Sequence, residues 1–417
     1  MKTLSCLASL AVLFPVGAGA QAPRPQQPPP PNNAPQPPPR PPAPQPPGAP
    51  GQKPPVAAAG SPLPGLDPTL ISLFAAGRAE FEKAETVDSG LGPIFNDNSC
   101  GACHRGPALG GASPRSVMRF GRMVDGKFDP MVEKGGPLLQ DRAIHPGVRE
   151  IVPAEATLQV RRQTTPVFGL GLVEAIPDSI LTQLAARPAK NGVKGRAALV
   201  TDPVSGQTRV GRFGWKSQHA TLSSFSADAY LNEMGITNRL FPSENAPNGN
   251  GAVLRQADRI LDPEDAAAEK PDFELAADFM RLLAPLPTLP LSASAQIGRG
   301  LFETVGCADC HVPVLWTGAH PVAALANQPV ALYSDLLLHD MGPLGDGIPQ
   351  GAALGAEMRT APLWGLRASA PYLHDGRAAT VEDAIRAHEG QGKGAKDRYA
   401  ALRPAQRKAL LDFLGTL

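Results

Sequence analysis

The sequence is poor in net charge, aromatic residues, long apolar runs and cysteine. Its formal charge over 417 residues is +1, which points to a soluble globular protein rather than a nucleic-acid binder. Aromatic residues make up only 5% of the chain, a low share for an interior of this size. No segment approaches the ~20 apolar residues that a membrane-spanning helix needs.

Four of the five cysteines fall into two copies of one pattern, Cys-x-x-Cys-His. The copies are Cys100-Gly101-Ala102-Cys103-His104 and Cys307-Ala308-Asp309-Cys310-His311. In this pattern the two thiols can add across the vinyl groups of haem, and the histidine becomes an axial iron ligand. A zinc or dithiol site is the alternative, but the paired cysteines of a zinc ribbon lie roughly 15–20 residues apart, whereas these pairs are separated by roughly 200. We expect two covalent haem c groups, whose macrocycles supply part of the missing apolar bulk.

The N-terminus has the features of a secretory signal peptide. Lys2 precedes an apolar stretch at residues 4–16, and the small residues Ala18-Gly19-Ala20 follow it, the order expected for cleavage after residue 20. Cys6 offers a lipidation site as an alternative, but it lies near the start of the apolar run instead of after it. We therefore expect a periplasmic or otherwise exported protein, with no transmembrane segment in the mature chain and no cysteine left for a disulfide.

Residues 21–66 are dominated by Pro, Gln and Ala, with runs such as Pro28-Pro29-Pro30-Pro31. This composition cannot bury a core and favours polyproline II or disorder, so we interpret the segment as a disordered linker. A specific recognition ligand for a partner is the alternative. Ordered structure is expected to begin near Asp67, a candidate N-cap that is followed by apolar residues at helical spacing.

The rest of the chain is predicted to be mainly α-helical, with minor β-hairpin insertions in its first part. Strand-like residues surround a turn signal within residues 200–215, which predicts a hairpin. Helical patterns cover residues 222–234, 273–283, 293–305 and 407–414. Three prolines between residues 285 and 290 break the chain and mark a boundary. We predict two cytochrome c-like domains, residues 67–288 and 289–417, each with one covalent haem.

Two C-terminal segments resemble a known family signature. They are Arg359-Thr360-Ala361-Pro362-Leu363-Trp364-Gly365-Leu366 and Ala370-Pro371-Tyr372-Leu373-His374-Asp375-Gly376-Arg377. They are similar to the C-terminal signature of bacterial di-haem cytochrome c peroxidases and of the related enzymes that mature tryptophan-derived quinone cofactors. A closer resemblance, over nearly everything after Asp67, is to the di-haem oxidoreductases, also called thiol oxidoreductases. The segments that carry it are Gly90-Leu91-Gly92-Pro93, Gly169-Leu170-Gly171-Leu172-Val173-Glu174-Ala175-Ile176-Pro177, Phe213-Gly214-Trp215-Lys216, Asn232-Glu233-Met234-Gly235-Ile236-Thr237 and Leu338-His339-Asp340-Met341-Gly342.

The resemblance implies roles for three residues. Counting onward from His374, the distal ligand of the second haem falls on His388, where the relatives have Met or Tyr. A histidine pair should lower the reduction potential relative to Met ligation, because a thioether favours reduced iron. Glu233 matches the acid that the relatives place in the distal pocket of the first haem, where a carboxylate can move the protons of peroxide. Trp215 matches the tryptophan between the two haems and is expected to relay electrons.

Each of these assignments has a structural alternative. His388 is otherwise a histidine at a helix C-terminus, and Glu233 is otherwise a solvated charge at a helix end. Trp215 is otherwise a core residue. Glu174 is a second candidate for the acid.

The same resemblance bears on the sixth ligand of the first haem and on calcium. Relatives that rest with a histidine on the first haem supply it shortly before an Arg-Asn-Ser-Pro-type segment. Here nothing from residue 149 to residue 161 is histidine, and His145 lies too far upstream, so we expect an open first iron. Gln163 replaces the calcium-binding Asn of the relatives and Ser369 replaces a loop Thr, which leaves Ca²⁺ between the domains as an option.

Together these observations predict an exported di-haem c-type oxidoreductase of the peroxidase type. The His311 haem would accept electrons from a small redox protein or a quinol-linked donor, and the His104 haem would reduce peroxide or another small oxidant. Two alternatives are a non-enzymatic di-haem electron carrier with both irons six-coordinate, and an oxidase of a protein or thiol substrate. No cysteine outside the motifs and the leader supports thiol chemistry.

Overall fold

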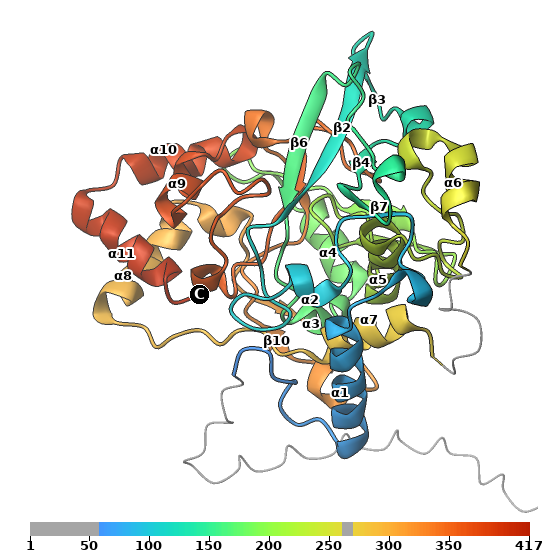
Figure 1. Cartoon of the computed structure of the whole chain (residues 1–417). Helices are drawn as coiled ribbons and strands as arrows, with labels where there is room; N and C mark the ends of the chain where they lie inside the picture. Colours follow the sequence, from blue (N-terminus) through green and yellow to red (C-terminus); the bar gives the residue numbers. More distant parts are fainter. Residues whose placement is uncertain (1–57, 261–269) are drawn as a thin grey trace, which may run out of the picture. The chain divides into compact units, whose positions relative to one another are not determined.

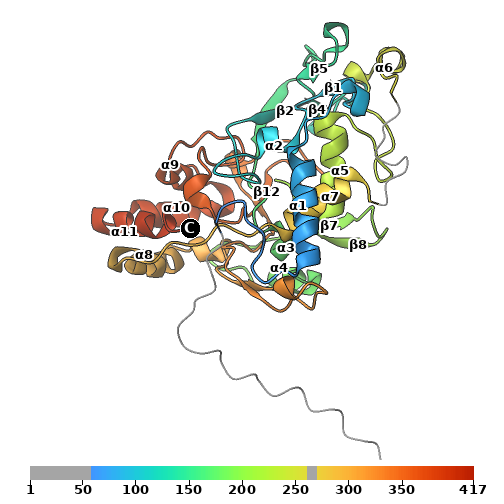
Figure 2. The same cartoon turned by 60° about the horizontal axis from the view of Figure 1, so that its bottom comes forward.

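Two helix pairs form the framework of the computed structural model, which describes residues 58–260 and 270–417. In the first pair, α1 (Pro68–Glu82) packs on α7 (Asp272–Leu282), and in the second, α8 (Ala293–Thr304) packs on α11 (Pro404–Leu414) (Figure 1 and Figure 2). These elements confirm the helices that the apolar spacing predicts after Asp67 and over residues 273–283, 293–305 and 407–414. Asp67 caps α1 as predicted, because its carboxylate accepts a hydrogen bond from the Leu70 N–H at 2.9 Å.

Each helix pair crosses at a glycine. A Cβ on Gly77 of α1 would lie 2.3 Å from the backbone oxygen of Leu275 in α7, and a Cβ on Gly298 of α8 would lie 1.9 Å from that of Ala409 in α11. Only a residue without a side chain allows so close an approach of two backbones.

A phenylalanine follows each of these glycines by one helical turn. Phe81 lies 4.8 Å from Phe279 between ring centroids, and Phe302 lies 5.5 Å from Phe413. Both pairs join the first helix to its partner. The shared pattern Gly-Arg-x-x-Phe is an internal repeat ahead of the two cysteine motifs.

The remaining helices are shorter. The predicted helix over residues 222–234 is confirmed as α5 (Leu222–Ala229), which continues as a π-helical turn, Tyr230–Met234. The others are α2 (Cys100–Cys103), α3 (Leu170–Glu174), α4 (Asp178–Ala186), α6 (Gly251–Ala257), α9 (Val381–Arg386) and α10 (Lys393–Ala400). Within the described residues, each helix is too short or too polar to cross a bilayer.

The strands form small antiparallel sheets. The largest has four strands around β2 (Ser116–Val124), which pairs with β3 (Lys127–Asp129), β4 (Leu138–Leu139) and β6 (Leu158–Gln163) (Figure 1). The two-stranded sheets are β1 (Ile94–Phe95) with β5 (Arg142–Ala143), β7 (Ala198–Thr201) with β8 (Thr208–Gly211), β9 (Leu315–Trp316) with β10 (Pro329–Val330), and β11 (Leu338–Asp340) with β12 (Glu357–Arg359). The β7–β8 pair is the predicted hairpin, closed by a 2.8 Å hydrogen bond from the Gly206 N–H to the Asp202 oxygen.

The predicted fold class is only partly right, because the protein combines helices with more sheet structure than expected. Strands were predicted only before residue 288, but β9 to β12 all follow it. These strands are two or three residues long, and so short a segment shows no alternation of apolar and polar residues that a sequence analysis can detect.

Ordered structure begins before the predicted linker boundary at residue 66. Leu63 is buried, its N–H donates to the Leu282 oxygen at 2.7 Å, and Pro62 forms a β-bridge with Leu283. This short segment is therefore fixed against the end of α7. The predicted signal peptide and residues 21–57 of the predicted linker lie outside the described residues.

The largest apolar core contains residues from both sides of the predicted domain boundary. Phe279 and Leu283 belong to the same cluster as Leu325, Leu336 and Trp364. A second cluster lies between α8 and α11. The division into domains at residues 67–288 and 289–417 stays a prediction.

Candidate haem pockets

The first Cys-x-x-Cys-His motif folds as one helical turn, α2, followed by His104. Ser99 caps this turn by accepting a hydrogen bond from the Ala102 N–H at 3.1 Å. Cys100, Cys103 and His104 line one cavity, which we call the first pocket. Burial raises the pKa of both thiols to about 12. Without a bound metal the two thiols therefore stay protonated, unlike the reactive thiolate of a redox dithiol.

The ring of His104 is prepared to bind a metal through Nε2. Its Nδ1 lies 3.3 Å from the Gly111 oxygen, and burial lowers its pKa to about 4. A neutral ring that donates its Nδ1–H to a carbonyl keeps the lone pair on Nε2, the form in which histidine ligates iron. Phe81 of α1 packs against this ring at 5.9 Å between centroids.

The second motif repeats this arrangement. Cys307, Cys310 and His311 line another cavity, the second pocket. The Nδ1 of His311 lies 3.0 Å from the Tyr333 oxygen, and its pKa is lowered to about 4, mainly by burial. Phe302 of α8 lies 6.5 Å from the ring, as Phe81 does at the first motif.

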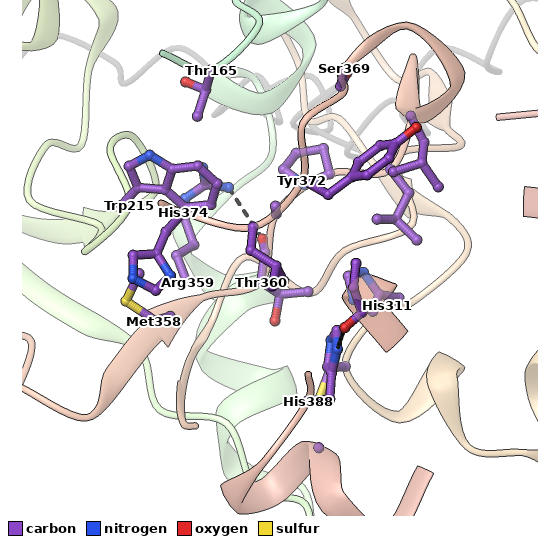
Figure 3. A pocket seen from close by; sticks show the side chains of 18 of the residues that line it. Thr165, Trp215, His311, Met358, Arg359, Thr360, Ser369, Tyr372, His374 and His388 are labelled. Carbon is purple, nitrogen blue, oxygen red and sulfur yellow. Dashed lines mark hydrogen bonds between the residues drawn. The ribbon is translucent and has the colours of Figure 1, made fainter. Parts of the chain in front are cut away.

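His388 lies beside His311 in the second pocket (Figure 3). It follows α9, its Nδ1 lies 2.7 Å from the Ala384 oxygen, and burial lowers its pKa. Both histidines therefore use Nδ1 for a backbone carbonyl and keep Nε2 for a metal. Gly392 leaves room for the ring, since a Cβ there would lie 3.0 Å from His388 Cδ2. Both side chains could therefore ligate a haem iron in this pocket, and ligation by His388 stays a prediction.

His339 lines the same pocket, but both of its ring nitrogens are occupied. Nε2 lies 2.9 Å from Asp335 Oδ2, and Nδ1 lies 2.9 Å from Gln391 Oε1. Burial is the largest influence and lowers the pKa of His339, but the hydrogen bonds and charges of Asp335 and Cys310 together outweigh it and raise the pKa to about 11. A protonated ring has no lone pair for iron, so His388 is the better candidate ligand.

Glu233 lines the first pocket, as predicted. It lies in the π-helical turn after α5, and its Oε2 accepts a hydrogen bond from Asn96 Nδ2 at 2.8 Å. Burial raises the pKa of its carboxyl group. Glu233 is half-buried and faces a cavity, so it is not the solvated helix-end charge of the alternative interpretation.

Six further charged residues line the first pocket and were not predicted from the sequence as site residues: Asp97, Arg115, Arg119, Asp141, Arg162 and Asp228. Asp228 of α5 lies 3.4 Å from His219 Nε2, and Arg119 of β2 has a buried Nε without a hydrogen-bond partner in the described part of the chain. The available signal was an aspartate between two alanines on the helix that leads to Glu233. Nothing in the local sequence of β2 marks Arg119.

Glu174, the second candidate for the acid, does not line either pocket. Its Oε2 lies 2.7 Å from Arg281 Nε, and its Oε1 accepts a hydrogen bond from the Leu222 N–H at 2.7 Å. Glu174 therefore ties α3 to α5 and α7, and its role is structural.

Trp215 lies between the two pockets. It lines both of them, and the other residues common to both are Gln163, Thr164, Thr165, Gly214 and Phe225. Its indole N–H donates to the Gln163 oxygen at 2.9 Å, and its ring lies edge-on to His374 at 6.2 Å (Figure 3). The position agrees with the sequence prediction, and electron relay through Trp215 stays a prediction.

The two positions considered for calcium make hydrogen bonds within the protein. Gln163 Nε2 donates to the Pro371 oxygen at 2.9 Å, and the Ser369 hydroxyl donates to the Gly365 oxygen at 2.8 Å. Calcium prefers several oxygen ligands, with carboxylates among them. No Asp or Glu from the described residues joins Gln163 on the wall of the second pocket, and calcium binding stays a prediction.

Comparisons with solved structures give distant similarities. Hydrazine synthase of Kuenenia stuttgartiensis is 16% identical, with a TM-score of 0.39 over 88% of this chain and 97% of that chain. The diheme peroxidase BthA of Burkholderia thailandensis is 14% identical, with a TM-score of 0.34 over 87% of each chain. A MauG-like protein associated with microbial copper homeostasis is 16% identical, with a TM-score of 0.30 over 60% of this chain and 89% of that chain. Similarity at this level carries no argument about the fold.

Family membership rests on the sequence. The comparison with curated proteins found no match. Residues 151–417 match the family model described as "Di-haem oxidoreductase, putative peroxidase", which covers more than half of the chain, including the second motif, Trp215, Glu233 and His388. The chain therefore belongs to the di-haem oxidoreductase family, whose members carry two haems.

Proposed function

We propose that this protein is an exported di-haem c-type cytochrome that reduces peroxide at the His104 haem and receives electrons through the His311 haem. The observation that carries the proposal is the difference between the pockets: Glu233 and other acids line the first, whereas His388 faces His311 in the second. Membership of a family of peroxidase type supports peroxide as the substrate. Covalent attachment, the roles of the two pockets and export are parts of the proposal.

The side chains of both pockets fit covalently attached haem. Each pocket combines two buried thiols of raised pKa with a neutral imidazole whose Nδ1 lies against a backbone carbonyl oxygen. A thiol adds across a vinyl group of haem to form a thioether, and the neighbouring histidine then ligates the iron. When bound, haem supplies an iron that exchanges electrons and, with an open coordination position, accepts a small ligand.

Glu233 is the proposed carrier of the proton. Reduction of hydrogen peroxide to two waters consumes two electrons and two protons. The Glu233 carboxylate takes one proton from the incoming peroxide and returns it to the departing oxygen, and the net protons come from solvent. Asn96 fixes the carboxylate, because its Nδ2 donates to Glu233 while its Oδ1 accepts from the Asp141 N–H at 3.1 Å.

The second pocket serves electron transfer in this proposal. His311 and His388 would both ligate the haem iron in this pocket, which would leave no coordination position for peroxide. Trp215 lines both pockets and offers the path between the haems. The external donor is a small redox protein or a quinol-linked donor outside the cytoplasm, as the leader sequence suggests.

A second function has support from two methionines. Met234 and Met280 also line the first pocket. A thioether bound to the first iron would fill its sixth position and make the protein a di-haem electron carrier without peroxidase activity.

The proposal is tested by peroxide turnover of a Glu233→Gln variant. We expect kcat to fall by about 10²–10⁴-fold, the usual contribution of general acid–base catalysis, with both haems retained. Glu150→Gln is the matched control, because burial also raises the pKa of Glu150, which lies outside both pockets. Unchanged turnover of Glu233→Gln would exclude Glu233 as the proton carrier. A native holoprotein without turnover would favour the electron carrier.

A further inference from the structure

One cation on the wall of the second pocket lacks a carboxylate partner. Three arginine or lysine side chains line this pocket. Arg212 pairs with Asp178, and Lys396 pairs with Glu389. Arg359, the last residue of β12, forms no ion pair with any described residue, and no described Asp or Glu lines the pocket.

The guanidinium of Arg359 is only partly used by the protein. Its Nε donates to the Gly214 oxygen at 2.8 Å, and its Nη1 donates to the Thr360 oxygen at 3.2 Å. Within residues 58–260 and 270–417, Nη2 makes no hydrogen bond. The side chain is half-buried and lies among Trp215, His374 and Thr360 at the pocket wall (Figure 3). Burial lowers its pKa to about 10, with no contribution from another charged group, so it carries an unpaired positive charge at neutral pH.

A cation that is withdrawn from water is stable when it is paired. The planar fork of arginine matches a carboxylate with two parallel hydrogen bonds. Haem carries two propionate carboxylates. We propose that Arg359 is the binding site for a propionate carboxylate of the haem attached at Cys307 and Cys310.

Arg359 also contacts the tryptophan between the pockets. Its backbone N–H donates to the Trp215 oxygen at 3.0 Å, in addition to the bond from Nε to the Gly214 oxygen. Arg359 therefore holds the Trp215 segment and the propionate from one position. This inference rests on the proposed haem in the second pocket and is independent of peroxide chemistry in the first.

The contact has an electrostatic consequence for one haem only. Removal of the guanidinium leaves a propionate charge unpaired in surroundings of low dielectric constant. An unpaired negative charge near the iron favours the ferric form, so the reduction potential of the second haem should fall. The first haem lies in the other pocket and should keep its potential.

The test is a spectroelectrochemical titration of both haems in native protein and in Arg359→Gln. We expect a negative shift for the second haem alone. Arg209→Gln is the control, since Arg209 pairs with Asp178 at 3.2 Å and lines neither pocket, and both potentials should stay unchanged. Two bound haems with unaltered potentials in Arg359→Gln would overturn the inference.

Arg359→Lys provides a second measurement if the Gln variant does not fold. Lysine keeps the charge but replaces the two-pronged contact by a single one, so the resonance Raman bands of propionate bending should shift for the second haem. Unshifted bands would overturn the inference. Absence of haem on Cys307 and Cys310 in the mass of the native protein would refute the haem placement itself.

Discussion

The two pockets share one scaffold but differ in the side chains that complete them. In each, a helix pair crosses at a glycine, a phenylalanine packs near the motif histidine, and that histidine binds a backbone carbonyl through Nδ1. Four acidic residues line the first pocket: Asp97, Asp141, Asp228 and Glu233. Of the described residues, no acid lines the second, which instead contains His311, His339, His374 and His388.

This difference shows which part of each pocket sets its chemistry. The motif and the helix pair place the thiols and one ligand in the same way twice. The opposite wall comes from unrelated segments: α5 and its π-helical turn in the first pocket, and the segment after α9 in the second. The acidic side chains of the first pocket can transfer protons. The imidazole of His388, as a second iron ligand in the other pocket, favours electron transfer instead.

Replacing His388 by Ala removes the feature that most clearly separates the pockets. We expect complete loss of the low-spin signal of the second ferric haem, because its sixth position then opens. Met341→Leu is the control, since Met341 also lines this pocket and should leave the signal intact. The measurement is electron paramagnetic resonance of both ferric variants. An unaltered spectrum of His388→Ala would show that another residue is the second ligand of this haem.

The pH dependence of peroxide turnover tests whether Glu233, one of the acids that line the first pocket, moves the proton. Burial raises the Glu233 pKa above the usual 4.5, and the carboxylate must be deprotonated to accept a proton. The kcat/KM should therefore fall as the pH drops through this raised pKa, by about tenfold per pH unit for a single group. This fall of kcat/KM at low pH should disappear in Glu233→Gln. If it persists in that variant, a group other than Glu233 causes it.

Substituting alanine for Gly77 or Gly298 tests whether the close approach of the helices contributes equally to stability in the two helix pairs. A Cβ at Gly77 or Gly298 would lie 2.3 Å or 1.9 Å from a backbone oxygen of the partner helix, so each variant should lose about 1–3 kcal/mol in the free energy of unfolding. Gly300→Ala on α8 is the control, with no atom within 4 Å of its Cβ. Urea denaturation measures the free energy of unfolding of the three variants. Equal values for Gly298→Ala and Gly300→Ala would contradict the close approach of α8 and α11 at Gly298.

Trp215→Phe should have the smallest effect on stability. It removes the indole hydrogen bond to the Gln163 oxygen, at a cost of about 1 kcal/mol. Both potentials should persist, while electron transfer from the second haem to the first slows. Stopped-flow spectroscopy resolves the two haems, and an unchanged rate would leave Trp215 as a packing residue.

The parts of the site that depend on fixed local spacing could be predicted from the sequence. Haem attachment requires two thiols and a histidine within five residues, and helix spacing predicted α1, α7, α8 and α11. The family segments point to Trp215, Glu233 and His388. All three line the pockets, and their roles stay predictions.

The missed features depend on contacts between distant segments. Arg119, Asp228 and Arg359 reach the pockets only because β2, α5 and β12 fold against other parts of the chain. The sequence also did not indicate that Asp335 binds the ring of His339. The Gly-Arg-x-x-Phe repeat was available in the sequence, but only an alignment of the two motif regions on each other would have shown it.

Electron paramagnetic resonance of the resting ferric protein tests the central difference between the pockets most directly. The proposal predicts a high-spin signal from the His104 haem, whose sixth position is open, together with a low-spin signal from the haem between His311 and His388. Low-spin signals from both haems would contradict it and would make the protein an electron carrier.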